Sequence, residues 1–229
     1  MSAKTSDQET TGEKDHMKTT TICIVAITLC SANLFAQKTA QAPREAIIFT
    51  GATQEAPDAE VKIFSNLGSS TAAYFNQGYL VLGPSNTLGD PSQSIGLPFK
   101  PAKASHAQTL EAGIQWYSSG ANQVRLSLYS DASGVPGTKL AGPITVKNLA
   151  TFPACCAVAK ATIPSTALTA GTQYWIVADT VATGTGDDFA GVWNAAGNQT
   201  QIASDLGGAG YTAFPPSNIP AGAVYGTIP

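Results

Sequence analysis

Two adjacent cysteines, Cys155 and Cys156, are the residues whose type most directly suggests chemistry in this chain. They do not suit a metal site, because neighbouring side chains of a strand point to opposite faces and zinc takes four ligands. Beyond residue 36 the sequence offers no further cysteine and a single histidine, His106. The redox motif Cys-x-x-Cys is also absent from the sequence.

The surroundings of the pair favour a bond between the two sulfur atoms. In an oxidising compartment thiols pair, and here each cysteine has only its neighbour as a partner. Adjacent Cα atoms lie about 3.8 Å apart across a trans peptide, closer than the usual disulfide separation of about 4.4–6.8 Å. We therefore expect a vicinal disulfide Cys155–Cys156 in a tight turn, with two free buried thiols as the alternative. Either form is structural.

A second candidate is the acidic, glycine-rich segment 183–200, "TGTGDDFAGVWNAAGNQT". The carboxylates of Asp187 and Asp188 could bind Ca²⁺, the one cofactor that the sequence suggests. They could also bind sugar hydroxyls beside Trp193 and Tyr211, the two aromatic residues that we expect to be partly exposed. The alternative, which we favour, is an ordinary Asp-Asp turn that leads into a core strand with a buried tryptophan.

The sequence gives little reason to expect an enzyme. His106 would be the base of any serine triad, and no nucleophile-elbow sequence accompanies it. Walker, dinucleotide-binding and zincin motifs are absent as well. Acidic residues are present, but one sequence cannot place two of them across a cleft, as a glycosidase requires. We therefore expect no catalytic residues.

Short strands must position these residues. In segment 108–117, "QTLEAGIQWY", Leu110, Ala112, Ile114 and Trp116 share one face, and in segment 123–130, "QVRLSLYS", apolar residues again alternate with polar ones. Segment 173–179, "QYWIVAD", is apolar on both faces, as expected for a central strand. About ten such segments, separated by turn residues, predict an all-β fold: a two-sheet antiparallel β-sandwich of jelly-roll-like build.

The N-terminal region has the pattern of a targeting segment. Residues 1–16 are polar and read as an upstream-start extension, and residues 17–36 contain a charged start and the apolar run 22–29, "ICIVAITL". This run is too short to span a bilayer, and it fits a signal peptide cleaved after Ala36. We expect a spacer over 37–60, a β-sandwich domain over 61–229, and a secreted or periplasmic location.

The charge balance restricts the possible partners. The formal net charge is −3, and the sequence contains no cluster of lysine and arginine of the kind that binds the phosphates of nucleic acids. No second apolar stretch reaches membrane length, so no membrane contact is expected after signal cleavage. The expected partner is an extracellular glycan or protein.

The order of the motifs "IFSNLG", "QSIGLPFKP", "LYSDASGVPGTKLA", "LTAGTQYWIVAD" and "DFAGVW" resembles the choice-of-anchor type β-sandwich domains of secreted bacterial proteins. The resemblance covers roughly residues 61–229. It implies export and the sandwich fold, and it carries over no catalytic residues. Our leading expectation is a non-catalytic exported module with a binding or structural, matrix-type role. The alternatives are a Ca²⁺-assisted carbohydrate-binding module and a small secreted hydrolase.

Overall fold

The computed structural model describes residues 60–229, apart from the side chains at 118, 198–200, 216 and 217. The expected extension and signal peptide, with nearly all of the expected spacer, fall outside this range. Within it the chain forms strands and no helix, and so contains no helix that could cross a membrane. The strands are β1 Val61–Ser65, β2 Gly78–Leu82, β3 Gln93–Phe99, β4 Ser105–Ala112, β5 Ile114–Ser119, β6 Gln123–Asp131, β7 Pro136–Lys147, β8 Ala159–Leu168, β9 Tyr174–Asp179, β10 Ala190–Leu206, β11 Tyr211–Pro220 and β12 Gly222–Thr227.

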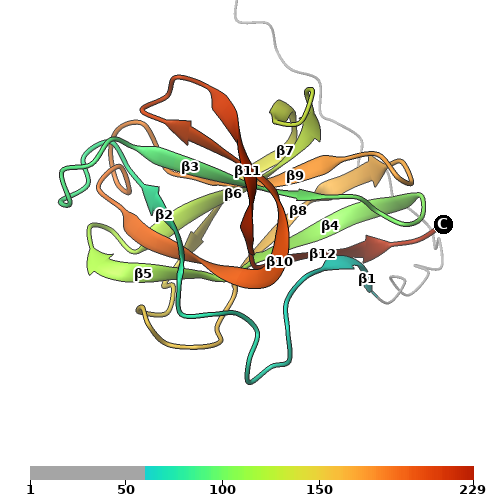
Figure 1. The fold of residues 1–229 in the computed structure, drawn as a ribbon, viewed down its shortest axis with the longest axis horizontal. Helices are drawn as coiled ribbons and strands as arrows, with labels where there is room; N and C mark the ends of the chain where they lie inside the picture. Colours follow the sequence, from blue (N-terminus) through green and yellow to red (C-terminus); the bar gives the residue numbers. More distant parts are fainter. Residues whose placement is uncertain (1–59) are drawn as a thin grey trace, which may run out of the picture. The chain divides into compact units, whose positions relative to one another are not determined.

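The strands build two antiparallel sheets, which confirms the predicted β-sandwich (Figure 1). The small sheet has the order β1-β12-β4-β8. The large sheet has the order β11-β10-β2-β3-β9-β6-β7, and β5 also pairs with β10. Strand β10 is long and curved: its first part, Ala190–Asn194, pairs with β2 and β5, and its last part, Ala203–Leu206, pairs with β3.

The main core lies between the two sheets and follows the predicted alternation. Leu110 of the small sheet and Leu126, Leu128 and Ile176 of the large sheet are all fully buried in one cluster. Strand β9 is buried on both faces, as the sequence indicates, because Trp175 and Val177 face away from this core and are still 0% exposed.

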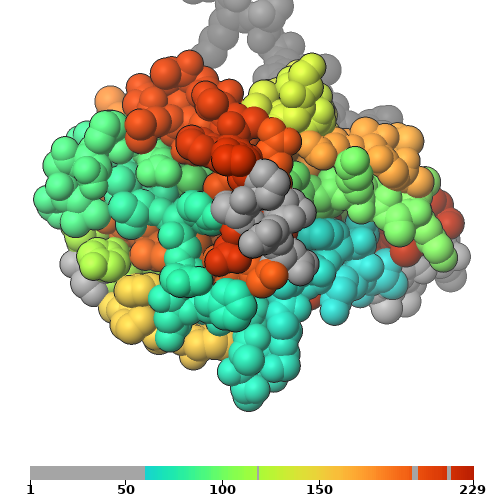
Figure 2. All heavy atoms as spheres, viewed as in Figure 1, coloured from blue at the N-terminus to red at the C-terminus, as the bar shows by residue number. Residues whose placement is uncertain are grey.

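A second, smaller core explains why the outer face of β9 is buried. Trp175, Val177 and Ala203 pack there with Tyr129, Val135 and Tyr211. The β6–β7 turn and the β10–β11 hairpin fold over this face of the large sheet and lie side by side (yellow-green and orange-red in Figure 2). Gly96 fits beneath them, since a Cβ at this position would lie 3.0 Å from Pro136 and 3.1 Å from Trp175.

Two strands pass from one sheet to the other at a shared corner. The continuous segment β4–β5 changes sheet at Gly113, and β11–β12 changes sheet at Ala221. Three backbone hydrogen bonds join these two points and Asn194 of β10 to one another: Gly113 N to Ala221 O (2.9 Å), Ala221 N to Asn194 O (2.8 Å) and Asn194 N to Gly113 O (2.9 Å). The corner therefore ties the two sheets together at one end.

Candidate functional site

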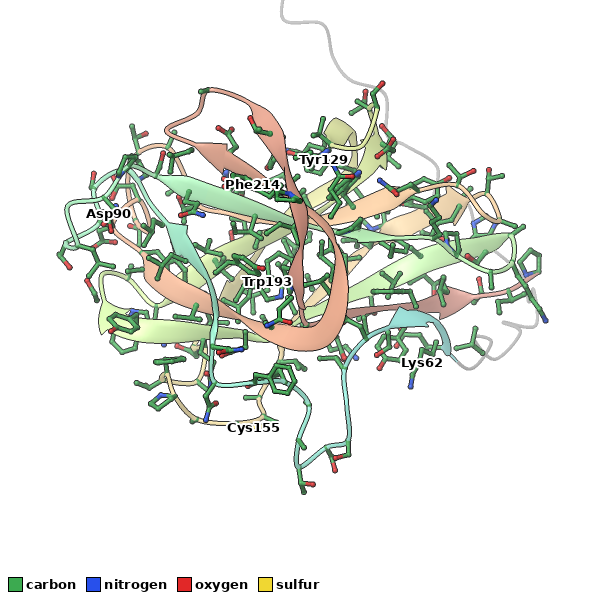
Figure 3. The ribbon with its side chains drawn as sticks, viewed as in Figure 1. Lys62, Asp90, Tyr129, Cys155, Trp193 and Phe214 are labelled. Carbon is green, nitrogen blue, oxygen red and sulfur yellow. A yellow bond between two sulfur atoms is a disulfide. The ribbon has the colours of Figure 1, made fainter. Side chains whose placement is uncertain are left out.

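Trp193 belongs to this corner and not to the surface. Its side chain is 0% exposed, and its indole Nε1 donates a hydrogen bond of 2.8 Å to Ala221 O. Figure 3 shows it inside the sandwich. The expectation that Trp193 is partly exposed is therefore wrong, and the alternative of a buried core tryptophan holds. The physical reason is that the indole fills the space between the sheets where two strands change sheet, and satisfies a backbone carbonyl there.

The two aspartates of the acidic segment hold separate turns. Asp187 Oδ2 accepts hydrogen bonds from Gly184 N (3.2 Å) and Ser85 Oγ (3.3 Å). Asp188 Oδ1 accepts one from Ala121 N at 2.9 Å. The carboxylates thus have different neighbours, and residues 60–229 contain no group of three His, Cys, Asp or Glu side chains that could hold a metal ion. The first part of the acidic segment, residues 183–189, lies in the turn that connects β9 to β10, and the rest belongs to β10.

Tyr211 is the one predicted aromatic residue beside a polar surface. It is half-buried on the outer face of the large sheet, and its ring lies edge-on to that of Tyr129 with 6.4 Å between the centroids. Burial raises the pKa of Tyr211 strongly, and the neighbouring Tyr129, Asp179 and Asp205 add to this, while a hydrogen bond with the Ser94 side chain opposes it.

Strand register places Tyr211 at the end of a polar row. Asp205 of β10 pairs with Tyr211 on one side and with Ser94 of β3 on the other. Ile95 pairs with Ala178, so the neighbouring Ser94 lies next to Asp179 of β9, and Asp179 pairs with Arg125 of β6. Paired residues share a face of the sheet. We call Arg125, Asp179, Ser94, Asp205 and Tyr211 the polar row.

A cavity of about 400 Å³ opens over the polar row. We call it the outer pocket. Its lining comes from β2, β3, β6, the β9–β10 connection and the β10–β11 hairpin: Leu82, Pro84, Ser92, Ser94, Arg125, Asp179, Thr180, Val181, Ala182, Asp205, Gly207 and Gly208. None of the four residues singled out from the sequence, Asp187, Asp188, Trp193 and Tyr211, lines this pocket. Sequence reasoning missed the residues that do.

An ion pair dominates the electrostatics of the outer pocket. Arg125 Nε donates to Asp179 Oδ1 at 2.8 Å, with 25% and 15% of the two side chains exposed. Burial raises the pKa of Asp179, and the hydrogen bond and charge of Arg125 oppose this. Asp205 Oδ1 accepts a hydrogen bond from Gly210 N at 3.0 Å, which leaves its second oxygen for a ligand.

The residues around the outer pocket do not form a triad. His106 lies on β4 of the small sheet, paired with Thr227 and Ala167, whereas the pocket lies on the large sheet. The two carboxylates that line the pocket, Asp179 and Asp205, come from neighbouring parts of the sheet, and Asp179 is bound to a guanidinium. This set can bind a polar ligand through charged donors and acceptors.

The cysteines lie elsewhere, on the loop between β7 and β8. Cys155 and Cys156 form a disulfide, and the peptide bond between them is cis. Ala73 N donates to Cys156 Sγ at 3.2 Å, and Tyr74 Oη donates to Ala157 O at 2.7 Å. Figure 3 places Cys155 on the opposite side of the view from Tyr129. The expected vicinal disulfide is present, and it holds a loop rather than the pocket.

Comparisons with known proteins add no assignment to this geometry. No protein-family model matches the chain, and no curated protein is significantly similar to it in sequence. The resemblance to choice-of-anchor domains therefore stays a prediction.

Proposed function

We propose that this chain is an exported, non-catalytic binding module that recognises carbohydrate in the outer pocket. The observation that carries the proposal is the convergence of Arg125, Asp179 and Asp205 with the hydroxyls of Ser94 and Thr180 in one open cavity. A purely structural, matrix-type role gives no reason for carboxylates to converge in a pocket.

The chemistry of the pocket suits a sugar. Sugar hydroxyls both donate and accept hydrogen bonds, and carboxylate and guanidinium groups form stronger hydrogen bonds than neutral side chains. Leu82, Pro84 and Val181 add apolar surface on which the C–H face of a sugar ring can lie. This arrangement replaces the platform first expected from Trp193, which is buried.

The length of the row favours an oligosaccharide over a single sugar. From Arg125 to Asp205 the row crosses β6, β9, β3 and β10. At about 4.8 Å per strand, these three steps span about 14 Å, enough for more than one sugar unit. The pocket is also open to solvent along this row, since Ser94, Arg125 and Asp179 are all partly exposed.

The experiment is a glycan panel on the purified protein, run with Ca²⁺ and again with chelator, followed by Asp205→Asn. The asparagine keeps an oxygen for Gly210 N and removes the charge. We expect Asp205→Asn to weaken binding about tenfold, as for one charged hydrogen bond. Asp90→Asn is the matched control, because Asp90 is an exposed acid outside the pocket lining.

Three outcomes would change the assignment. Equal loss in Asp90→Asn would mean a general charge effect instead of a site. Release of reducing sugar that disappears in Asp179→Asn would assign hydrolysis to the same pocket. No binding across the panel by folded protein would reject the carbohydrate proposal and direct the search to protein partners.

A further inference from the structure

A second cavity lies between the two sheets, on the side where β1 is the edge of the small sheet and β11 is the edge of the large sheet. Its volume is about 400 Å³, within the range of small-molecule sites. Its lining residues belong to β1, β3, β10 and β11, together with the residues that directly follow β1 and β3 and the residue that precedes β9. We call it the inter-sheet groove. It shares no lining residue with the outer pocket.

The walls of the inter-sheet groove are apolar. They are formed by Phe64, Pro98, Phe99 and Ile219. The rings of Phe64 and Phe99 lie 5.4 Å apart between centroids, and Phe99 continues the stack to Tyr174 at 5.9 Å. Phe99 and Ile219 are buried at 3% and 4% exposure, whereas Phe64 is only partly covered. Phe99 and Ile219 thus form the buried inner wall of the groove, and Phe64 lies at its solvent-exposed side.

The polar part of the lining carries one positive charge and no negative one. Lys100, at the end of β3, is exposed and makes no ion pair within residues 60–229. The amides of Gln173 and Gln201 lie beside it in the lining. No aspartate or glutamate lines the groove.

The positive charge of Lys100 helps to lower the pKa of one acid, Asp131. The two carboxylate oxygens of Asp131 already accept hydrogen bonds from other groups. Trp175 Nε1 and Gln173 Nε2 donate to Asp131 Oδ1 at 2.8 and 2.7 Å, and Gly134 N donates to Oδ2 at 3.1 Å. Three donors compensate this carboxylate, so it does not need Lys100 as a partner. The ammonium group of Lys100 remains available to an anion from solution.

We propose that the inter-sheet groove binds a small amphipathic carboxylate, with its apolar body against Phe64, Phe99 and Ile219 and its carboxylate at Lys100. The apolar walls supply affinity through the area that they remove from water, and the lysine selects a negative head group. An uncharged molecule of the same shape gains only the first contribution. This proposal stands on its own residues and does not depend on carbohydrate binding in the outer pocket.

The test uses octanoate and 1-octanol as matched probes, titrated into the isotope-labelled protein and followed by amide chemical shifts. We expect octanoate to shift the amides of Phe64, Ser65, Lys100 and Gln173, and to bind more tightly than octanol. In Lys100→Gln the affinity for octanoate should fall about two- to fivefold, to that of octanol, which should not change. The substitution is at an exposed position, so the fold should be retained.

Lys103→Gln is the control, since Lys103 is also exposed but lines a different, smaller cavity. It should leave both affinities unchanged. Equal affinity of the unaltered protein for the two probes would overturn the role of Lys100. Shifts confined to residues outside the groove, or no shifts at saturating probe, would overturn the site itself.

Discussion

Tyr211 shows at the residue scale how the polar row changes the properties of a side chain. Its hydroxyl lies on a half-buried face with Asp179 and Asp205 among its charged neighbours, and burial together with these charges raises the pKa of Tyr211. Burial also raises the pKa of its ring neighbour Tyr129. Perturbed ionisable groups that gather beside a cavity are a common mark of functional sites, which agrees with the outer pocket as the candidate.

The raised pKa of Tyr211 predicts a loss of stability at high pH. Below about pH 10 the tyrosine keeps its proton in both states, so it does not affect the pH dependence. Above about pH 10 the unfolded chain releases this proton while the native protein retains it, and the free energy of unfolding falls by up to about 1.4 kcal/mol per pH unit.

Urea unfolding at pH 8, 10.5 and 11.5 can measure this effect. In Tyr211→Phe the slope of the unfolding free energy above pH 10 should be shallower than in the unaltered protein. The difference between the two proteins at pH 8 reports the lost hydroxyl, with its hydrogen bond to the Ser94 side chain, without any ionisation, and serves as the internal control. Parallel slopes above pH 10 would show that the Tyr211 hydroxyl ionises as in an unfolded chain.

The limits of sequence reasoning are also visible in single residues. Alternation correctly predicted Leu110, Ile114 and Leu126 in the core, because the period of a strand is local information. Arg125 and Asp179 are 54 positions apart in the sequence, and they meet only because β6 and β9 are adjacent strands of the sheet. For the same reason the sequence left Trp193 with two interpretations, partly exposed or buried, since its partner Ala221 is 28 positions away.

At the element scale, the corner between the sheets holds β10, a strand that contributes to the lining of both cavities. Strand β10 curves past this corner, carrying Asn194 at one end and Asp205 of the outer pocket at the other. Asn194 Nδ2 also donates to Gly113 O at 2.9 Å and to Gln115 Oε1 at 3.1 Å. A polar network of this kind inside a core fixes the path of the strands, because each group would be costly to bury alone.

Gly113 allows the crossing of β4 into β5, and its replacement should be costly. A Cβ at Gly113 would lie 2.8 Å from the ring of Tyr74. We expect Gly113→Ala to lower the free energy of unfolding by about 1–3 kcal/mol, as overpacking does in other cores. Denaturant titration measures the change.

Tyr74→Ala provides the matched partner for a double-mutant cycle. It removes the ring atoms Cδ1 and Cε1 that the new methyl group would meet, so the cost of Gly113→Ala should be smaller in this background. Additive effects of the two substitutions would show that the glycine is needed for another reason, such as its backbone conformation.

At the scale of the whole molecule, the disulfide and the expected signal peptide both agree with the proposed export of the chain. Cys155 is exposed and Cys156 partly buried on the loop between β7 and β8, and a disulfide persists in oxidising compartments. The apolar run at residues 22–29 predicts export to such a compartment. Export would also place the outer pocket where the carbohydrate that we propose as its ligand is found.

These two features predict the form of the secreted protein. When the full chain is expressed in a bacterium, we expect the exported protein to begin at Gln37, as measured by intact mass. Its tryptic peptide 148–160 should be lighter than the reduced peptide by two hydrogens, because Cys155 and Cys156 are bonded to each other. Val25→Asp places a charge in the apolar run and should retain the chain in the cytoplasm, where reducing systems keep both cysteines as thiols.

An exported protein whose two cysteines react fully with a thiol reagent would contradict the disulfide. A chain that remains in the cytoplasm with residues 1–36 intact would contradict export, and with it the extracellular role proposed for the outer pocket.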